Sequence, residues 1–387
     1  MSEGQLYVRD SRTLREYEIP ITRDTVPAGA FGQIKGPVTD PTRIDKGSRG
    51  LKIYDPGLAN TATIESGLLY IDGEKGQLLF RGHSIEQLWD CDFEDVVHLM
   101  VWEKLPSPLE KESLRSALSL AMMDVPDEVV RVIEAFPRSA PPVPIVMAGL
   151  SAYVANKPDD IPAYTGGNIY HGNVEKAHKG VVRTLATWAV VVSLTARHRE
   201  GTQFVPASPH EKYYENLFAM MGHVDKNTGL PDPLHLRCFR RFGALSIDHG
   251  LSNSTFAMLV TASTLADPIS SIISALTAAY GPLHFGAPES AYKIMTRLEI
   301  PENVPWLIES VKRGERRLFG YGHRTYTVAD PRIGPIQTLL EELDAKSNPL
   351  LKVAQEIDRL ASSDEYFKKR GINSNADLYG VFFYITM

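Results

Sequence analysis

The segment GYGHRTYTVADPR at residues 320–332 says more about the fold and chemistry of this chain than any other stretch. Gly320 and Gly322 allow the backbone to come close to a ligand beside His323, because glycine adopts conformations that a side chain forbids. Arg332 follows nine residues after His323 and offers a planar fork that fits a carboxylate. The segment is not a dinucleotide fingerprint, since Thr325 stands where the third glycine is needed.

Two further glycine-bearing segments carry a histidine where the chain turns or a helix starts. They are LSIDHGLSNSTF (245–256) with His249, and GPLHFGAPES (281–290) with His284. Taken singly, each histidine is most simply a partly exposed polar residue in a loop. The chain has no HExxH, no paired cysteines and no GxSxG elbow, so neither metal-dependent nor serine hydrolysis is supported.

Five sequence blocks resemble the successive blocks of citrate synthases, in the same order and at similar spacing. They are YDPGLANTATIESGLLYIDGEKGQLLFRGHSIEQL (54–88), the three histidine segments, and NSNADLYG (373–380). The match runs from about residue 48 to the end, and on these blocks the chain is identified as a member of the citrate synthase family.

The resemblance implies an all-α fold with a large helical domain, a small helical domain and a short N-terminal β-hairpin. Residues 1–277 together with 374–387 would form the large domain, and residues 278–373 the small one, which closes over a cleft containing the histidines. Because family members are homodimers with sites near the interface, a homodimer is expected here too.

The resemblance also implies a role for each site residue. His284 would hold the thioester oxygen of an acyl-CoA, His323 would bind the ketone of a 2-oxo acid, and Asp377 would be the base. His249 would contact the 2-oxo acid, and Arg332 would pair with one of its carboxylates.

These residue types suit the implied reaction, in which an acyl-CoA condenses with oxaloacetate to a citrate-type tricarboxylic acid and CoA is released. A thioester methyl is a very weak acid, so a carboxylate can remove its proton only if a fixed donor meets the developing enolate oxygen. No metal or other cofactor is required, since the acyl-CoA is itself a substrate. The alternative for Asp377 is a helix N-cap, because it precedes the apolar run LYGVFFYITM (378–387).

The chain departs from the family pattern around these residues. Ser246 and Gly250 stand in place of a histidine and a glutamate, and Ser252 in place of a common asparagine. Phe285 replaces a glycine beside the acyl site, and Thr327 replaces a basic residue, which weakens the case for a CoA phosphate contact there.

The chain also stops at Met387, inside an apolar helix, whereas family members continue for some tens of residues with arginines for the oxo acid. A helix ending in FFYITM would leave apolar side chains and carbonyls uncovered. We therefore expect a truncated chain or gene model whose activity is open.

Three functions stay open at this point. The first is a citrate synthase acting on acetyl-CoA, and the second is a 2-methylcitrate or longer alkylcitrate synthase, because the departures near the pocket are of the kind that retune it. The third is a non-catalytic paralogue that keeps the fold, which the missing arginines favour and the retained His284, His323 and Asp377 disfavour.

Composition excludes several classes of protein. The 387 residues hold 41 Lys and Arg against 47 Asp and Glu, a net charge of -6, which provides no field for nucleic acid or an anionic membrane. Two cysteines, Cys91 and Cys238, form no disulfide framework and favour a reducing compartment. The first residues resemble no secretory or transit peptide, so the cytoplasm is expected, with a peroxisomal address left open if the C-terminus is truncated.

Local patterns predict the elements. LLYI (68–71) and QLLFR (77–81) flank a turn and predict a hairpin, whereas residues 1–50 are expected to form an irregular, partly extended arm. Capping-box pairs predict helix starts at Ser84 and Ser107, and apolar spacing predicts amphipathic helices over 336–343 and from Pro349 to 360. The apolar run at 185–196 is about half of a bilayer span and predicts a core helix.

Overall fold

Two units make up the chain in the computed structural model, Met1–Ser66 and Gly67–Met387. The structure describes residues 3–36, 50–281, 283–284, 286–323 and 325–387. In the first unit, β1 (Glu3–Arg9) pairs antiparallel with β2 (Glu16–Thr22), and a 3-10 helix, η1 (Ala28–Gln33), follows. The predicted arm is therefore extended here, as expected, but it is a regular strand pair over Glu3–Arg9 and Glu16–Thr22, where the prediction of an irregular segment is wrong. Apolar residues such as Ile19, which is fully buried, alternate there with polar ones.

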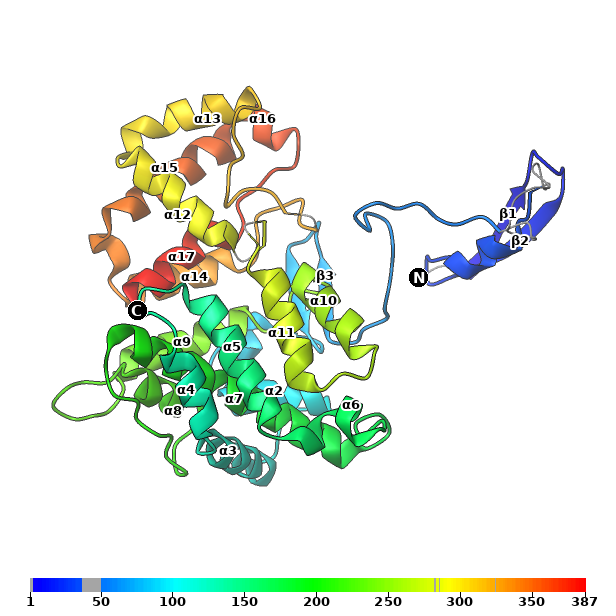
Figure 1. Ribbon diagram of the computed structural model, residues 1–387. Coiled ribbons are helices and arrows are strands. Elements are labelled where there is room, and N and C mark those ends of the chain that lie inside the picture. The colour runs from blue at the N-terminus through cyan, green and yellow to red at the C-terminus, as the bar shows by residue number, and fades with distance from the viewer. Residues whose placement is uncertain (1–2, 37–49, 282, 285, 324) are drawn as a thin grey trace. The chain divides into compact units, whose positions relative to one another are not determined.

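The second unit consists of helices around a small antiparallel sheet (Figure 1). The sheet has the order β3-β4-β5, built from β3 (Leu69–Asp72), β4 (Gln77–Phe80) and β5 (His83–Ser84), and this confirms the predicted hairpin. The helices follow in chain order: α1 (Ile85–Leu88), α2 (Phe93–Trp102), α3 (Pro108–Met122), α4 (Asp127–Glu134), α5 (Pro142–Ala155), η2 (Pro158–Asp160), α6 (Pro162–Thr165), α7 (Val174–Glu200), α8 (Tyr213–Met221), α9 (Pro233–Leu245), α10 (Asn253–Ala262), α11 (Pro268–Ala279), α12 (Gly286–Leu298), η3 (Pro301–Asn303), α13 (Val304–Lys312), α14 (Ile333–Glu342), η4 (Ala345–Ser347), α15 (Pro349–Ser363), α16 (Glu365–Lys368) and α17 (Asp377–Thr386).

Helix starts occur where the capping residues predict them. Ser84 and Gln87 form a reciprocal capping box at α1, and Ser107 and Glu110 form another at α3. The helices predicted from apolar spacing are α14 and α15, and Pro349 occupies the first position of α15. No helix in the described part of the chain combines the length and apolar character needed to span a bilayer.

One hydrophobic cluster surrounds α7, the predicted core helix. Val190 and Val191 of α7 are fully buried against α3, α5 and neighbouring helices. At Gly149 of α5, an added Cβ would lie 2.8 Å from Cγ1 of Val191, so the two helices pack too closely for a side chain. Burying a valine or leucine contributes about 1.5–3 kcal/mol, so this cluster stabilises the helical bundle substantially.

A second cluster joins the helices α12 to α17, which lie together in yellow to red in Figure 1, to α9 and the sheet. Phe383 of α17 stacks on Phe242 of α9 with ring centroids 4.1 Å apart. Phe382 and Phe383 are fully buried, so the predicted exposure of the last apolar run is wrong for them and correct for Tyr384, which is 62% exposed. The division into a large and a small domain at residue 277 stays a prediction.

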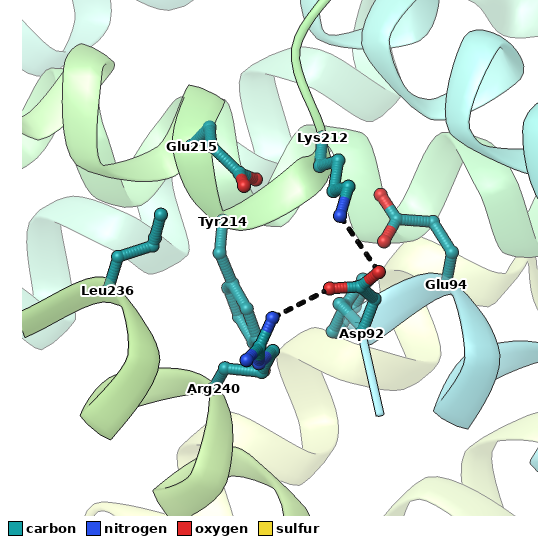
Figure 2. Close-up of a pocket in the computed structure, with 8 residues that line it drawn as sticks. Asp92, Glu94, Lys212, Tyr214, Glu215, Leu236 and Arg240 are labelled. Carbon is teal, nitrogen blue, oxygen red and sulfur yellow. Dashed lines mark hydrogen bonds and ion pairs between the residues drawn. The ribbon is translucent and has the colours of Figure 1, made fainter. Parts of the chain in front are cut away.

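A polar cluster at the start of α2 ties four helices together (Figure 2). The Asp92 carboxylate accepts hydrogen bonds from Lys111 of α3 at 2.6 Å, Lys212 before α8 at 2.9 Å and Arg240 of α9 at 3.0 Å. Burial acts to raise the pKa of Asp92, but the hydrogen bonds from Lys111 and Lys212 outweigh it and bring the pKa to about 2.

The neighbouring Glu94 has a less favourable environment. Its side chain is buried, and its Oε1 accepts the N–H of Tyr213 at 2.9 Å, while its Oε2 has no hydrogen-bond partner among the described residues. The cavity beside it measures about 10 Å³, room for roughly one water molecule. Burial therefore raises the pKa of Glu94.

Substitutions at these two acids are expected to change stability in opposite directions. Because the folded-state pKa of Glu94 lies above its unfolded value, the folded state holds more protons, and the free energy of unfolding falls as pH rises above the ordinary carboxyl range. Glu94→Gln should therefore stabilise the protein by about 1 kcal/mol at pH 8 and by less at pH 5. Asp92→Asn should destabilise it by about 3 kcal/mol, since Lys212 and Arg240 lose their carboxylate partner and Lys111 keeps only Asp95. Denaturant unfolding at both pH values tests this, and an equal effect of Glu94→Gln at pH 5 and pH 8 would contradict it.

Candidate active site

The His323 loop is held against the segment that precedes α17. The N–H of Gly322 donates to the carbonyl of Asn373 at 2.7 Å, and the N–H of Asn375 donates to the carbonyl of Gly320 at 3.0 Å. The Asn375 side chain adds a bond to the carbonyl of Gly322 at 2.8 Å. Both glycines have positive φ, and a Cβ on Gly320 would lie 2.9 Å from Cβ of Leu378, so Gly320 lets the loop pack closely against α17. The close approach of this backbone to a ligand stays a prediction.

Asp330 anchors Arg332 beside the first residue of α17. Its Oδ1 accepts from the backbone N–H and Nε of Arg332, both at 3.0 Å, and its Oδ2 accepts from Nη2 at 2.7 Å and from the N–H of Ala376 at 3.2 Å. Burial acts to raise the pKa of Asp330, but Arg332 outweighs it and the pKa is lowered. The sequence-based reading missed Asp330, although the D-P-R spacing was the available signal.

Asp377 is the first residue of α17, and its N–H donates to the side-chain oxygen of Asn375 at 3.0 Å. Ala376 occupies the N-cap position of α17. The alternative interpretation of Asp377 as the N-cap residue is therefore wrong. Burial raises the pKa of Asp377, with the charge of Arg332 opposing and that of Asp330 adding to the shift. A raised pKa makes this carboxylate a stronger base.

The rings of His249, His323 and Tyr326 pack together near Arg332. The ring centroids of His249 and His323 are 4.8 Å apart, those of His323 and Tyr326 are 4.6 Å apart, and those of His249 and Tyr326 are 5.6 Å apart. Nδ1 of His323 accepts the N–H groups of Thr325 and Tyr326 at 3.0 and 3.2 Å, which leaves the ring proton on Nε2. The backbone of the loop therefore binds Nδ1 of the neutral ring, and the N–H at Nε2 is the donor on the other side of the ring.

Both histidines are neutral at pH 7. Burial lowers the pKa of His249 to about 4, with the charges of Arg332 and His323 adding to the shift. Burial likewise lowers the pKa of His323. Each ring can therefore donate a hydrogen bond without bringing a second positive charge next to Arg332.

His284 is tied to the first turn of α10. Its Nε2 lies 3.0 Å from the hydroxyl of Ser254, which lies 3.1 Å from that of Ser252, and Ser252 lies 2.9 Å from the hydroxyl of Thr255. Burial lowers the pKa of His284. The hydroxyl chain thus joins His284 to α10, the helix that follows the His249 loop in sequence. The sequence analysis missed Ser254.

The departures from the family pattern have local explanations. Gly250 has a φ of 74°, which a glutamate would adopt only with strain, and Ser246 is exposed at the end of α9. The N–H and hydroxyl of Thr327 both donate to the carbonyl of Gly73 in the β3–β4 turn, at 3.0 and 3.3 Å. Phe285 lies outside the described residues.

Ligand atoms of His249, His323 and Asp330 lie within 4.8 Å of one another, which is close enough for a metal ion. Both oxygens of Asp330 are already bonded to Arg332, however, and Nδ1 of His323 accepts two backbone N–H groups. A cation here would have to displace a guanidinium, so the donors of this site favour an anionic ligand.

Comparison with known proteins gives this geometry a context. The family profile described as citrate synthase, C-terminal domain, matches residues 57–387. The chain belongs to the citrate synthase family. It is 46% identical over 385 residues to the alkylcitrate synthase phiJ of a fungal species, covering 98% of this chain and 84% of that protein. It is 44% identical over 391 residues to the alkylcitrate synthase tstJ of Talaromyces stipitatus, covering 99% of this chain and 85% of that one.

More distant citrate synthases share the fold. The citrate synthase of Dictyostelium discoideum is 34% identical over 388 residues, covering 100% of this chain and 74% of that protein. The solved ternary complex of citrate synthase from Thermoplasma acidophilum with carboxymethyl coenzyme A and oxaloacetate has a TM-score of 0.76 at 25% identity, covering 86% of this chain and 84% of that one. The predicted family, the mostly helical fold and the citrate-synthase type of enzyme are confirmed, while the roles of the five site residues stay predictions.

Removing the charge of Asp330 should destabilise the fold more than removing that of another internal acid. Asp330→Asn leaves a buried guanidinium without its partner and should cost about 3 kcal/mol. Asp358 accepts hydrogen bonds from the neutral hydroxyls of Tyr321 and Tyr379, so Asp358→Asn should cost only about 1 kcal/mol. Urea unfolding of both variants checks the order, and equal losses would show that the ion pair does not anchor the site.

Proposed function

We propose that this chain condenses an acyl-CoA longer than acetyl-CoA with oxaloacetate, forming an alkylcitrate and releasing CoA. The observation that carries the chemistry is the grouping of a guanidinium, two neutral histidines and a carboxylate of raised pKa around one site. The preference for a longer acyl chain is supported by the two alkylcitrate synthases at 46% and 44% identity, compared with 34% for the Dictyostelium citrate synthase.

The oxo-acid end of the reaction uses Arg332, His323 and His249. Arg332 pairs with a carboxylate of oxaloacetate, and the N–H at Nε2 of His323 donates to the ketone oxygen. Because His323 is neutral, its donor stabilises the alkoxide as charge develops there and does not attract the carboxylates away from Arg332. His249, which touches the His323 ring, fixes the orientation of the oxo acid.

The acyl-CoA end uses Asp377 and His284. The Asp377 carboxylate takes a proton from the carbon next to the thioester, and a ring N–H of His284 donates to the enolate oxygen. The enolate carbon then forms a bond to the ketone carbon, whose oxygen becomes an alkoxide. This alkoxide takes up one proton, which balances the proton that Asp377 removed. Water hydrolyses the remaining thioester to a carboxylate and free CoA thiol, which makes the condensation hard to reverse.

The hydroxyl chain from Ser252 through Ser254 supports the part assigned to His284. The Ser254 hydroxyl lies 3.0 Å from Nε2 of His284, so the hydroxyl chain fixes the orientation of this ring relative to α10. Each step relies on proton transfer and on hydrogen bonds from side chains of this chain. The proposed reaction therefore requires no metal or redox cofactor. The cytoplasm remains the expected compartment.

A citrate synthase acting on acetyl-CoA is the second candidate, favoured by the match to a family that includes such enzymes. A hydrophobic pocket separates neighbouring chain lengths by only about 1–3 kcal/mol per methylene, so the two functions differ by graded preference. A panel of substrates distinguishes them directly.

Oxaloacetate-dependent thiol release from acetyl- through hexanoyl-CoA should be faster with a longer acyl chain than with acetyl. Asp377→Asn should lower this rate by about 10³-fold, because general base catalysis is lost. Asp344→Asn is the matched control, since Asp344 lies outside the site with a φ of 53°, which asparagine tolerates. A preference for acetyl-CoA would establish the second candidate, and no release with any acyl-CoA would overturn both.

We further propose that a second copy of the chain covers α10 and the residues that follow it. The helix α10 has the apolar sequence NSTFAMLVTA, yet none of its side chains is buried, and Val260 is 53% exposed. The following Leu265 is 46% exposed. A helix that is apolar on most faces is ordinarily buried, so these residues form a suitable homodimer surface.

Val260→Lys should convert a dimer to a monomer, because each copy would bring a lysine into the apolar contact. Val174→Lys is the control, since Val174 is also exposed, at 65%, but lies at the start of α7. Light scattering coupled to size-exclusion chromatography gives the mass of each variant. A wild-type monomer, or a dimer that tolerates Val260→Lys, would count against this surface.

A further inference from the structure

Tyr326 is a buried residue whose hydroxyl is left without a partner. Its side chain is only 2% exposed, and the hydroxyl makes no hydrogen bond within the described residues. The same is true of Nε2 of His249, whose ring packs against that of Tyr326. An unsatisfied buried hydroxyl is rare in native proteins and calls for a specific explanation.

The other buried tyrosines that the structure describes all have a partner for the hydroxyl. The partners are the carbonyl of Asp124 for Tyr153 at 2.6 Å, the carbonyl of Leu185 for Tyr213 at 3.0 Å, and the carboxylate of Asp358 for Tyr321 at 2.6 Å and for Tyr379 at 2.9 Å. The fold therefore satisfies tyrosine hydroxyls wherever they serve packing alone. Tyr326 differs from these tyrosines in lying within the site.

The surroundings of Tyr326 define the missing partner as an acceptor. Burial raises the pKa of the Tyr326 phenol to about 12, so it remains a donor at neutral pH. Its neighbours are the guanidinium of Arg332 and the neutral rings of His249 and His323, and the charge of Asp330 is already paired with Arg332. A group that fits among these donors carries negative charge on oxygen.

We propose that the Tyr326 hydroxyl donates a hydrogen bond to a carboxylate oxygen of the bound 2-oxo acid and so determines affinity for this substrate. The inference rests on the proposed function, because oxaloacetate is the anion that this function brings beside Arg332. Tyr326 has a second connection to the site through its own N–H, which donates to Nδ1 of His323. Tyr326 thus has two roles. Together with Thr325 its backbone fixes the tautomer of His323, and its side chain binds the oxo acid that His323 also contacts.

Tyr326→Phe tests the proposal because it deletes one oxygen and keeps the ring contacts. Without oxaloacetate, the variant should unfold at the same temperature as wild type or higher, since an unsatisfied group is removed. Its affinity for oxaloacetate should fall by about 10- to 100-fold, the loss expected for one hydrogen bond to a charged group. Calorimetric titration of oxaloacetate without acyl-CoA measures binding independently of turnover.

Tyr153→Phe is the matched control. It removes the hydroxyl that bonds to Asp124, so the melting temperature should fall while the affinity for oxaloacetate stays unchanged. If Tyr326→Phe instead melts lower and binds oxaloacetate as wild type does, the hydroxyl has a structural role and the proposal is overturned, while the proposed function stands. If wild-type protein does not bind oxaloacetate at all, the proposal fails together with the proposed function.

Discussion

The pairing of residues 320–332 with residues 373–377 is the constraint on which the rest of the site depends. Asp330 holds both sides, because its two oxygens bind the guanidinium of Arg332 and the backbone N–H of Ala376. The backbone bonds between Gly322 and Asn373 and between Asn375 and Gly320 complete the pairing. Asp377, Arg332 and His323, which we propose as the base, the carboxylate-binding cation and the ketone-binding residue, are thereby fixed relative to one another, which is the condition for electrostatic preorganisation.

Around this pairing, the fold keeps the two histidines neutral, so that they add no positive charge to that of Arg332. Burial favours the neutral form of both His249 and His323, and Asp330 neutralises Arg332 only in part of its donor fork. The same burial raises the pKa of Asp377 and makes it a better base. One physical cause, exclusion of water, therefore adjusts the donors and the base in the directions that an enolate reaction needs.

The sequence predicts much of this arrangement and misses specific parts for identifiable reasons. Capping boxes at Ser84 and Ser107 and the apolar spacing of α14 and α15 are local signals, and these elements form as predicted. Ser254 was missed because its partner His284 lies 30 residues away and follows from tertiary packing. Asp330 had a local signal in Arg332, two residues on, but its bond to the Ala376 N–H, 46 residues away, also follows from tertiary packing. The burial of Phe382 and Phe383 was mispredicted for the same reason, since the covering ring of Phe242 comes from α9.

The site also contains groups that lower the stability of the protein when no ligand is bound. Native interiors rarely leave polar atoms unpaired, yet the Tyr326 hydroxyl and Nε2 of His249 each raise the free energy of the protein without ligand. A ligand that pairs these groups binds the folded state alone, so its binding stabilises that state. These groups therefore indicate the chemistry of the proposed substrates. One is an anion with acceptors facing Arg332, Tyr326 and the two histidines, and the other has a proton-bearing carbon facing Asp377. A 2-oxo dicarboxylate meeting an acyl thioester satisfies both halves of that description, whereas either substrate alone leaves one half unmet.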